Sequence, residues 1–263
     1  MKILFLCTHL NVGGVGSYIV NLARGLNARD HQVLAASSGG GLVCELEGAG
    51  IRHLYVDIKT KSELSPKLIP AFFKLRSLIK REDIRIIHSH TRVTQVLGTL
   101  LAKSAAIGHI ATCHGFFKAR LGRRLFNCWG DKTIAISDAV RDHLVDDLNA
   151  KKENVELVYN GVELERFNRK FAQDEIDSIK KELGLGQNRV IGSIGRLSPV
   201  KGYKYLIEAF KLLLERHQDV ELLLVGDGPD KLSLRESAKR LGLEDKVKFI
   251  GPRRDIDLIL RAM

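Results

Sequence analysis

This sequence has few of the features that mark membrane-spanning, secreted or metal-stapled proteins. No stretch approaches the roughly 18 consecutive apolar residues of a membrane-spanning helix. The apolar run that opens the chain stops at Thr8, too early for a secretory signal core. Proline is scarce, with 5 in 263 residues, and 44% of the residues are hydrophobic, which excludes collagen-like and disordered classes. The four cysteines form no Cys-x-x-Cys pair, so we expect reduced thiols in a cytoplasmic protein: Cys7, Cys44, Cys113 and Cys128.

The charge balance is basic, with a formal net charge of +11. Such an excess favours anionic partners, either phosphorylated small molecules or an acidic membrane surface. The basic residues are spread over both halves of the chain, and no zinc-finger or aromatic RNA-binding signature is present. We therefore expect no nucleic-acid partner.

Short apolar segments alternate with stretches of helical spacing, a pattern typical of parallel α/β domains. The alternation is interrupted at the turn dipeptide Asn160-Gly161 and the charged segment Glu163–Gln173, and then starts again. We therefore predict two Rossmann-like parallel-sheet domains, residues 1–165 and 166–263. The second contains only three predicted strands, and its last predicted helix, Asp255–Met263, looks cut off. We expect a truncated second domain and a C-terminally incomplete chain.

A glycine-rich loop, Asn11–Ser17, joins the first predicted strand to the first predicted helix. Such a loop lets backbone N–H groups approach a phosphate at a helix N-terminus, although it also fits an ordinary tight turn. It lacks the third glycine of the dinucleotide fingerprint, and no carboxylate follows the next strand, Val33–Ala36. These departures argue against an NAD site.

Two cations, Arg196 and Lys201, lie between a predicted strand and helix in the second half of the chain. A guanidinium binds phosphate oxygens with two donors and an ammonium acts as a point charge, so together they suit a diphosphate. The alternative is two solvated surface cations. Because Gly-Lys-Ser/Thr is absent, the segment is not a P-loop.

Three other patterns carry weaker hypotheses. His88 and His90 are spaced like a metal pair on a strand end, but no further ligand pattern accompanies them. Cys113-His114 resembles a thiol nucleophile with its base, yet adjacent strand residues point to opposite faces. Asp255-Ile256-Asp257 spells a metal-binding motif but fits an acidic helix start better. We predict no metal site.

Aromatic residues stand beside basic ones in two segments, which suits an anionic lipid surface. The alternative is a solvated face with buried aromatic rings. The first segment contains Phe72, Phe73, Lys74, Arg76, Lys80 and Arg81, and the second contains Phe116, Phe117, Lys118, Arg120, Arg123 and Arg124.

Eight motifs in order resemble glycosyltransferase family 4, whose members are retaining enzymes with the two-Rossmann-domain GT-B architecture. The resemblance extends over the whole chain, although each motif is weak alone. The motifs are Gly13-Gly14-x-Gly16, Ile87-His88-Ser89-His90, Thr112-Cys113-His114-Gly115, Ile136-Ser137, Val158-Tyr159-Asn160-Gly161-Val162, Gly195-Arg196-Leu197-x₃-Lys201-Gly202, Val225-Gly226-Asp227-Gly228-Pro229 and Phe249-Ile250-Gly251.

The resemblance implies a role for each matching residue. Gly14 and Gly16 would lie near the donor phosphate or transferred sugar, and His114 would face that sugar. Arg196 and Lys201 would hold the diphosphate, Gly226, Asp227 and Gly228 would line the donor site, and backbone around Gly251 would meet the nucleobase. Two departures stand out. Glu163 replaces the family's usual Asp, and the family's Glu-x₇-Glu element is absent from these residues.

The expected function is that of a retaining glycosyltransferase. It would move a sugar from a nucleotide-diphosphate donor to an acceptor hydroxyl on a sugar, lipid-linked sugar or polysaccharide, without cofactor or metal. We expect a cytoplasmic protein with peripheral contact to the inner face of an anionic membrane. Because the Glu-x₇-Glu element is missing, the 263 residues alone are expected not to turn over. An inactive remnant and a sugar-nucleotide epimerase of the same fold are the alternatives.

Overall fold

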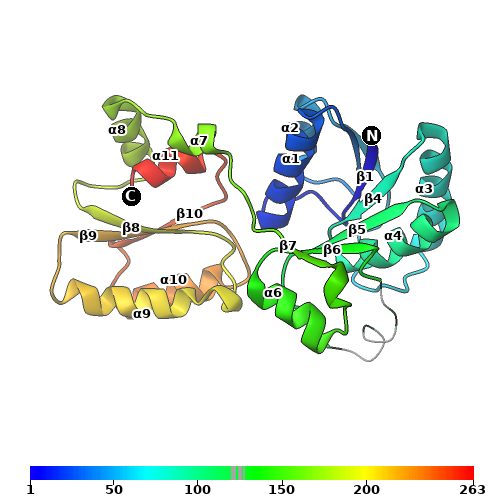
Figure 1. Ribbon diagram of the computed structural model, residues 1–263. Coiled ribbons are helices and arrows are strands. Elements are labelled where there is room, and N and C mark those ends of the chain that lie inside the picture. Colours follow the sequence, from blue (N-terminus) through cyan, green and yellow to red (C-terminus); the bar gives the residue numbers. More distant parts are fainter. Residues whose placement is uncertain (120–122, 124–125, 127) are drawn as a thin grey trace. The chain divides into compact units, whose positions relative to one another are not determined.

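The computed structural model describes residues 1–119, 123, 126 and 128–263. The chain divides into two compact units, Met1–Val162 and Glu163–Met263 (Figure 1). Each unit is a parallel α/β domain, and each is described by itself below.

The first unit is built on a seven-stranded parallel sheet with the order β3-β2-β1-β4-β5-β6-β7. This order places β1 and β4 side by side although five elements separate them along the chain. The strands are β1 (Lys2–Leu6), β2 (Gln32–Ser37), β3 (Arg52–Tyr55), β4 (Ile86–Ser89), β5 (Gly108–Cys113), β6 (Lys132–Ala135) and β7 (Val155–Leu157).

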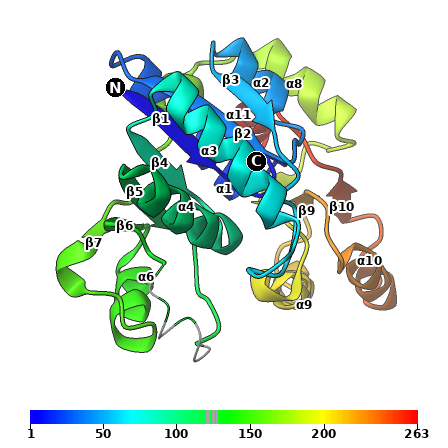
Figure 2. The ribbon, with the colours of Figure 1, turned by 90° about the vertical axis from the view of Figure 1, so that its right-hand side faces the viewer.

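Helices cover both faces of this sheet, because its central strands are apolar on both sides. On β1, Ile3 and Phe5 pack with the helices α1 (Gly14–Asn27) and α2 (Val43–Gly48). Leu4 and Leu6 of the same strand pack with α3 (Leu68–Glu82) and α4 (Arg92–Ala105) on the opposite face (Figure 2).

The last part of the first unit has its own apolar cluster. Trp129 is 2% exposed and packs with Cys113, Val140 and Leu144. The helix α6 (Asp138–Asp142) begins where the Ser137 hydroxyl accepts a hydrogen bond from the Val140 amide, and it continues into a π-helical turn, His143–Asp147.

The second unit is a three-stranded parallel sheet between two helical layers (Figure 1). Its strands are β8 (Arg189–Ile194), β9 (Val220–Val225) and β10 (Val247–Ile250), in the order β10-β9-β8. The helices α9 (Tyr203–Leu214) and α10 (Lys231–Arg240) cover one face, and α8 (Gln173–Glu182) and α11 (Ile256–Arg261) cover the other.

The prediction of two parallel α/β sheets, the second with three strands, is confirmed. Several short elements were not predicted, among them α6, β7 and the helix α7 (Leu164–Asn168). The helix α7 has no clear periodic pattern and is held by contacts with distant residues: Arg166 donates to the Arg254 carbonyl, and Arg261 donates to the Phe167 carbonyl. Among the described helices, none is long and apolar enough to cross a membrane.

Candidate functional site

The first group of candidate residues lies where the strand order of the first unit reverses, between β1 and β4. The carboxyl ends of these two strands are tied together, since the His90 amide donates to the Leu6 carbonyl at 2.9 Å. In open parallel sheets, ligands bind in the crevice outside the strand ends at such a switch point. The glycine-rich loop follows β1 here, and the motif that contains His88 and His90 ends β4.

The two candidate glycines, Gly14 and Gly16, are surrounded differently in the structure. A Cβ at Gly16 would overlap the Asn11 carbonyl, so a side chain cannot replace its hydrogen. A Cβ at Gly14 would meet nothing within 4 Å. Gly14 therefore leaves open backbone at the N-terminus of the 14-residue helix α1, where N–H groups favour an anion, whereas Gly16 is required by packing.

Three imidazoles and a phenol form a cluster near the carboxyl ends of β1, β4 and β5. The His88 and His90 rings lie 4.3 Å apart between centroids, and the His114 ring lies 5.7 Å from that of His90. Tyr18, on α1, meets the His114 ring edge-on at 4.8 Å and the His90 ring at 5.8 Å. Sequence reasoning missed Tyr18; its position one helical turn after Gly14 was the available signal.

Burial keeps these imidazoles neutral. Loss of water, with a smaller contribution from the nearby histidines, lowers the pKa of His88 to about 3, and loss of water lowers that of His114 to about 4. Burial also lowers the pKa of His90 well below its usual value. A neutral His114 suits a group that orients a sugar hydroxyl by hydrogen bonding better than a general acid.

The contacts of His88 and His90 do not indicate a metal site. His88 Nε2 lies 2.7 Å from the Thr112 hydroxyl, within hydrogen-bonding distance. His90 is 3% exposed, and neither of its ring nitrogens has a hydrogen-bond partner among the described residues. Among the residues that the structure describes, no group of three or more His, Cys, Asp or Glu side chains is arranged to hold a metal ion.

The environment of the Cys113 thiol does not suit a nucleophile. It donates a hydrogen bond to the Gly115 carbonyl at 3.1 Å, and burial raises its pKa to about 11. Because the thiolate is the reactive form, a thiol with this pKa is inert near neutral pH.

The second group of candidate residues lies at the carboxyl ends of the three strands in Glu163–Met263. The Gly195 amide donates to the Val225 carbonyl, and the Gly226 amide donates to the Ile250 carbonyl. These bonds bring the turns after β8, β9 and β10 side by side. A Cβ at Gly226, where φ is +138°, would overlap the Gly195 carbonyl, so glycine is required for this approach.

Arg196 and Lys201 leave this edge of the sheet as exposed cations. Neither cationic side chain makes an ion pair or a hydrogen bond within the described part of the chain, although many other surface cations are paired. Lys201 ends a short 3₁₀ turn directly before the 12-residue helix α9. Cations beside a helix N-terminus are chemically suited to a phosphate group.

The turn after β9 supports the segment that contains Arg196. The Leu197 amide donates to the Asp227 carbonyl at 3.0 Å, and a Cβ at Gly228 would overlap the Leu197 carbonyl. The Asp227 carboxylate accepts from the Gly228 amide and lies 3.6 Å from the Lys231 ammonium. Asp227 and Gly228 therefore shape the turn.

The segment after β10 begins with open backbone and is then fixed by charge. A Cβ at Gly251 would meet nothing within 4 Å. Arg253 binds the Asp255 carboxylate with two donors, at 2.9 and 2.6 Å, and also Glu182 of α8. Asp255 is the N-cap residue of α11 and Asp257 lies in its first turn, so the prediction of an acidic helix start is confirmed. The Asp255 carboxylate pairs with Arg253, however, and makes no capping hydrogen bond to the described backbone of α11.

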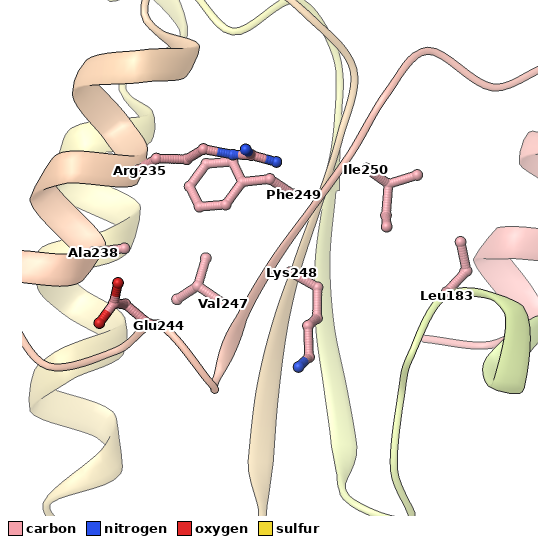
Figure 3. Close-up of a pocket in the computed structure, with 8 residues that line it drawn as sticks. All are labelled: Leu183, Arg235, Ala238, Glu244, Val247, Lys248, Phe249 and Ile250. Carbon is pink, nitrogen blue, oxygen red and sulfur yellow. The ribbon is translucent and has the colours of Figure 1, made fainter.

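A separate pocket of about 320 Å³ flanks the free edge of β10 (Figure 3). The Arg235 guanidinium lies over the Phe249 ring there, 5.6 Å from its centroid. None of the candidate residues named above lines this pocket, and its remaining lining residues are Leu183, Ala238, Glu244, Val247, Lys248 and Ile250.

Comparison with known proteins gives this arrangement a family. The sequence profile of Glycosyltransferase Family 4 matches residues 12–166. The chain belongs to glycosyltransferase family 4. The profile of Glycosyl transferases group 1 matches residues 175–263, so both units of this family 4 chain have counterparts among glycosyltransferases.

Individual relatives are distant. The chain is 27% identical to the Escherichia coli UDP-Gal:alpha-D-GlcNAc-diphosphoundecaprenol alpha-1,3-galactosyltransferase, over 84% of this chain and 62% of the relative. It is 26% identical to the Bacillus anthracis N-acetyl-alpha-D-glucosaminyl L-malate synthase, over 95% of this chain and 68% of the relative.

Among solved structures, Anabaena Alr3699/HepE in complex with UDP and glucose is 25% identical, with a TM-score of 0.84 that covers all of this chain and 72% of the other. The chain spans between 55% and 68% of the length of four curated relatives that it matches. The family resemblance and the GT-B fold predicted from the sequence are confirmed.

Proposed function

We propose that this chain is part of a retaining glycosyltransferase that moves a sugar from a nucleotide-diphosphate donor to an acceptor hydroxyl. The observation that carries the proposal is the position of two cations, Arg196 and Lys201, at the strand ends beside the N-terminus of α9, where neither side chain has an ion-pair partner in the described part of the chain. The name of the Escherichia coli galactosyltransferase gives UDP-Gal as its donor, and the Anabaena structure contains UDP and glucose. A UDP-sugar is therefore the first donor to assay.

In this proposal the chain's own residues act by position and charge. The bond between the sugar's anomeric carbon and the donor phosphate oxygen breaks, and the acceptor oxygen bonds to that carbon on the same face. The acceptor's proton passes to the departing phosphate oxygen. Arg196 and Lys201 stabilise the negative charge that develops on the diphosphate, which gives the site a source of charge stabilisation that needs no metal ion.

The first unit would supply the sugar-side contacts. Gly14 offers open backbone N–H groups at the start of α1, and neutral His114 is held edge-on by Tyr18. A neutral imidazole can both donate a hydrogen bond to a sugar hydroxyl and accept one from it. Because burial lowers its pKa to about 4, His114 is a weak base that competes poorly for the acceptor's proton. His114 then orients the sugar and is not an obligatory base.

The acceptor in this proposal carries an anionic group. By name, the Escherichia coli relative acts on a diphosphoundecaprenol-linked sugar and the Bacillus anthracis relative makes a malate glycoside. The net charge of +11 favours an acceptor of this kind. The synthesis of a glycolipid or a cell-surface polysaccharide is the corresponding role.

Peripheral contact with an anionic membrane belongs to the same proposal. Phe73 is 64% exposed and Phe116 is 68% exposed, so the expectation of buried aromatic rings does not hold for these two side chains. Both are close in sequence to exposed lysines, Lys74 and Lys118. Exposed rings beside cations suit insertion at a lipid headgroup surface. Arg120 and Arg124 of the second basic segment lie outside the described residues.

Calorimetric titration with UDP tests the donor site. Arg196→Ala and Lys201→Ala each remove a charge-assisted contact of about 1.5–3 kcal/mol, so the dissociation constant should rise roughly tenfold or more. Lys211→Ala, at the other end of α9, is the matched control and should bind like the wild type. Unchanged affinity in both site variants would remove the two cations from the site and leave the proposal without its main support.

Product analysis tests the reaction and separates it from the alternatives. The protein purified from its natural host is incubated with UDP-sugars, with and without a lipid-linked acceptor. Transfer with retention at the anomeric carbon supports the proposal. Epimerised donor without an acceptor would favour the epimerase, and absence of both donor binding and transfer would favour the inactive remnant.

A further inference from the structure

We propose that Arg92 binds a phosphate group of the acceptor, which makes the start of α4 an anion subsite. The inference rests on the proposed function and adds a residue that no motif singled out. Arg92 is the first residue of the 14-residue helix α4, directly after the cap residue Thr91 and two residues after His90.

Arg92 occupies a position that is unfavourable for a cation. The residue is 7% exposed, and its buried NH1 nitrogen has no hydrogen-bond partner among the described residues. It also stands in the first turn of a helix, where the positive end of the helix dipole repels a cation. A buried guanidinium with unused donors costs free energy unless an anion meets it.

The carboxylate nearby does not balance the positive charge. Glu63, in the loop between β3 and α3, lies 3.5 Å from the Nε of Arg92. The same Glu63 oxygen accepts hydrogen bonds from Nε and NH2 of Arg123, at 3.0 and 2.8 Å. One carboxylate is therefore shared by two guanidiniums, which leaves an excess of one positive charge.

The chemistry of the position selects a phosphate. A planar guanidinium presents paired donors that match two phosphate oxygens, and the α4 N-terminus adds favourable partial charge. The Trp129 ring holds Arg92 in place, because the guanidinium lies over this ring, 4.7 Å from its centroid. The phosphate comes either from a lipid carrier that bears the acceptor sugar or from a soluble sugar phosphate.

The contact between Arg92 and Trp129 supplies a site-specific signal, because Trp129 is the single tryptophan of the sequence. We would titrate the full chain with a hexose 1-phosphate, and separately with polyprenyl diphosphate in phosphatidylcholine vesicles, while following tryptophan emission. Hexose and vesicles with polyprenol are the uncharged counterparts. A saturable change with the first probe identifies a soluble acceptor, and with the second a lipid-linked one.

Variants connect the signal to the guanidinium. Arg92→Ala should weaken the binding of the active probe at least tenfold, and Arg92→Lys should retain part of it, since an ammonium keeps the charge but loses the paired donors. Glu63→Gln should tighten binding several-fold, because the competing carboxylate is gone. A merely structural Arg92–Glu63 pair predicts no such gain, so this variant decides the matter if Arg92→Ala does not fold.

Three results would overturn the inference. They are no saturable change with either phosphorylated probe, an equal change with the uncharged counterparts, or unaltered phosphate binding in both Arg92→Ala and Glu63→Gln. Arg196→Ala should leave the tryptophan titration unchanged while it weakens UDP binding. Failure of the anion subsite is therefore distinguishable from failure of the donor site.

Discussion

Acidification should unfold the first unit because its buried histidines have to remain neutral. Burial lowers the pKa of His109 to about 4 and that of His88 to about 3, against 6.5 without burial. A histidine whose pKa is lower in the folded state contributes stability above its unfolded pKa. That stability is lost as the pH falls from about 6.5 towards the folded value.

The loss of stability depends on how far the pH lies below the unfolded pKa of 6.5. Each pH unit below 6.5 costs about 1.4 kcal/mol per histidine until the folded pKa is reached. At pH 5 the loss is about 2 kcal/mol for each of His88 and His109, or about 4 kcal/mol together. A single domain is stable by only about 5–15 kcal/mol, so this loss is large. His90 and His114 act in the same direction.

Urea unfolding at pH 7, 6 and 5, followed by Trp129 fluorescence, measures this loss in Met1–Val162 alone, because the single tryptophan lies there. His109→Gln removes one titrating group while its amide can replace the contact with Ser89. Between pH 7 and 5, this variant should lose about 2 kcal/mol less than the wild type.

The control is His217→Gln, an exposed position in the other unit, which should show the wild-type dependence. Equal pH dependence of the wild type and His109→Gln would refute the reasoning, since it would mean that His109 does not stay neutral through burial.

Three further predictions concern packing, membranes and metal. Gly226→Ala should lower the melting temperature of the second unit by several degrees, because its Cβ overlaps the Gly195 carbonyl, whereas Gly251→Ala should change it little; a scan of both variants checks this. Phe73→Ser and Phe116→Ser should each reduce co-sedimentation with anionic vesicles at low salt, and binding to neutral vesicles at equal strength would contradict the electrostatic part of the interaction. Treatment with EDTA should leave UDP affinity unchanged, and a clear loss in calorimetry would show that a metal takes part.

The sequence predicted the class of fold well because the determinants are local. Apolar strands alternate with amphipathic helices along the chain, and this alternation is visible without a structure. It also placed Arg196 and Lys201 at a strand-to-helix turn, because they lie between an apolar strand pattern and a helical pattern. It missed α7, whose five residues are held by bonds from Arg166 and Arg261 to carbonyls about 90 residues away in the chain.

Only the tertiary structure distinguished residues that look alike in the sequence. Gly14 and Gly16 both lie in the first turn of α1, but a Cβ at Gly16 would overlap the Asn11 carbonyl, whereas a Cβ at Gly14 would meet open space. Tyr18 and Arg92 carry no motif, and they became candidates because the sheet order brings α1 and α4 to the same switch point. Local periodicity determines which segments are strands and helices. Which side chains lose water, and which charges remain uncompensated, depends on residues far apart in the chain.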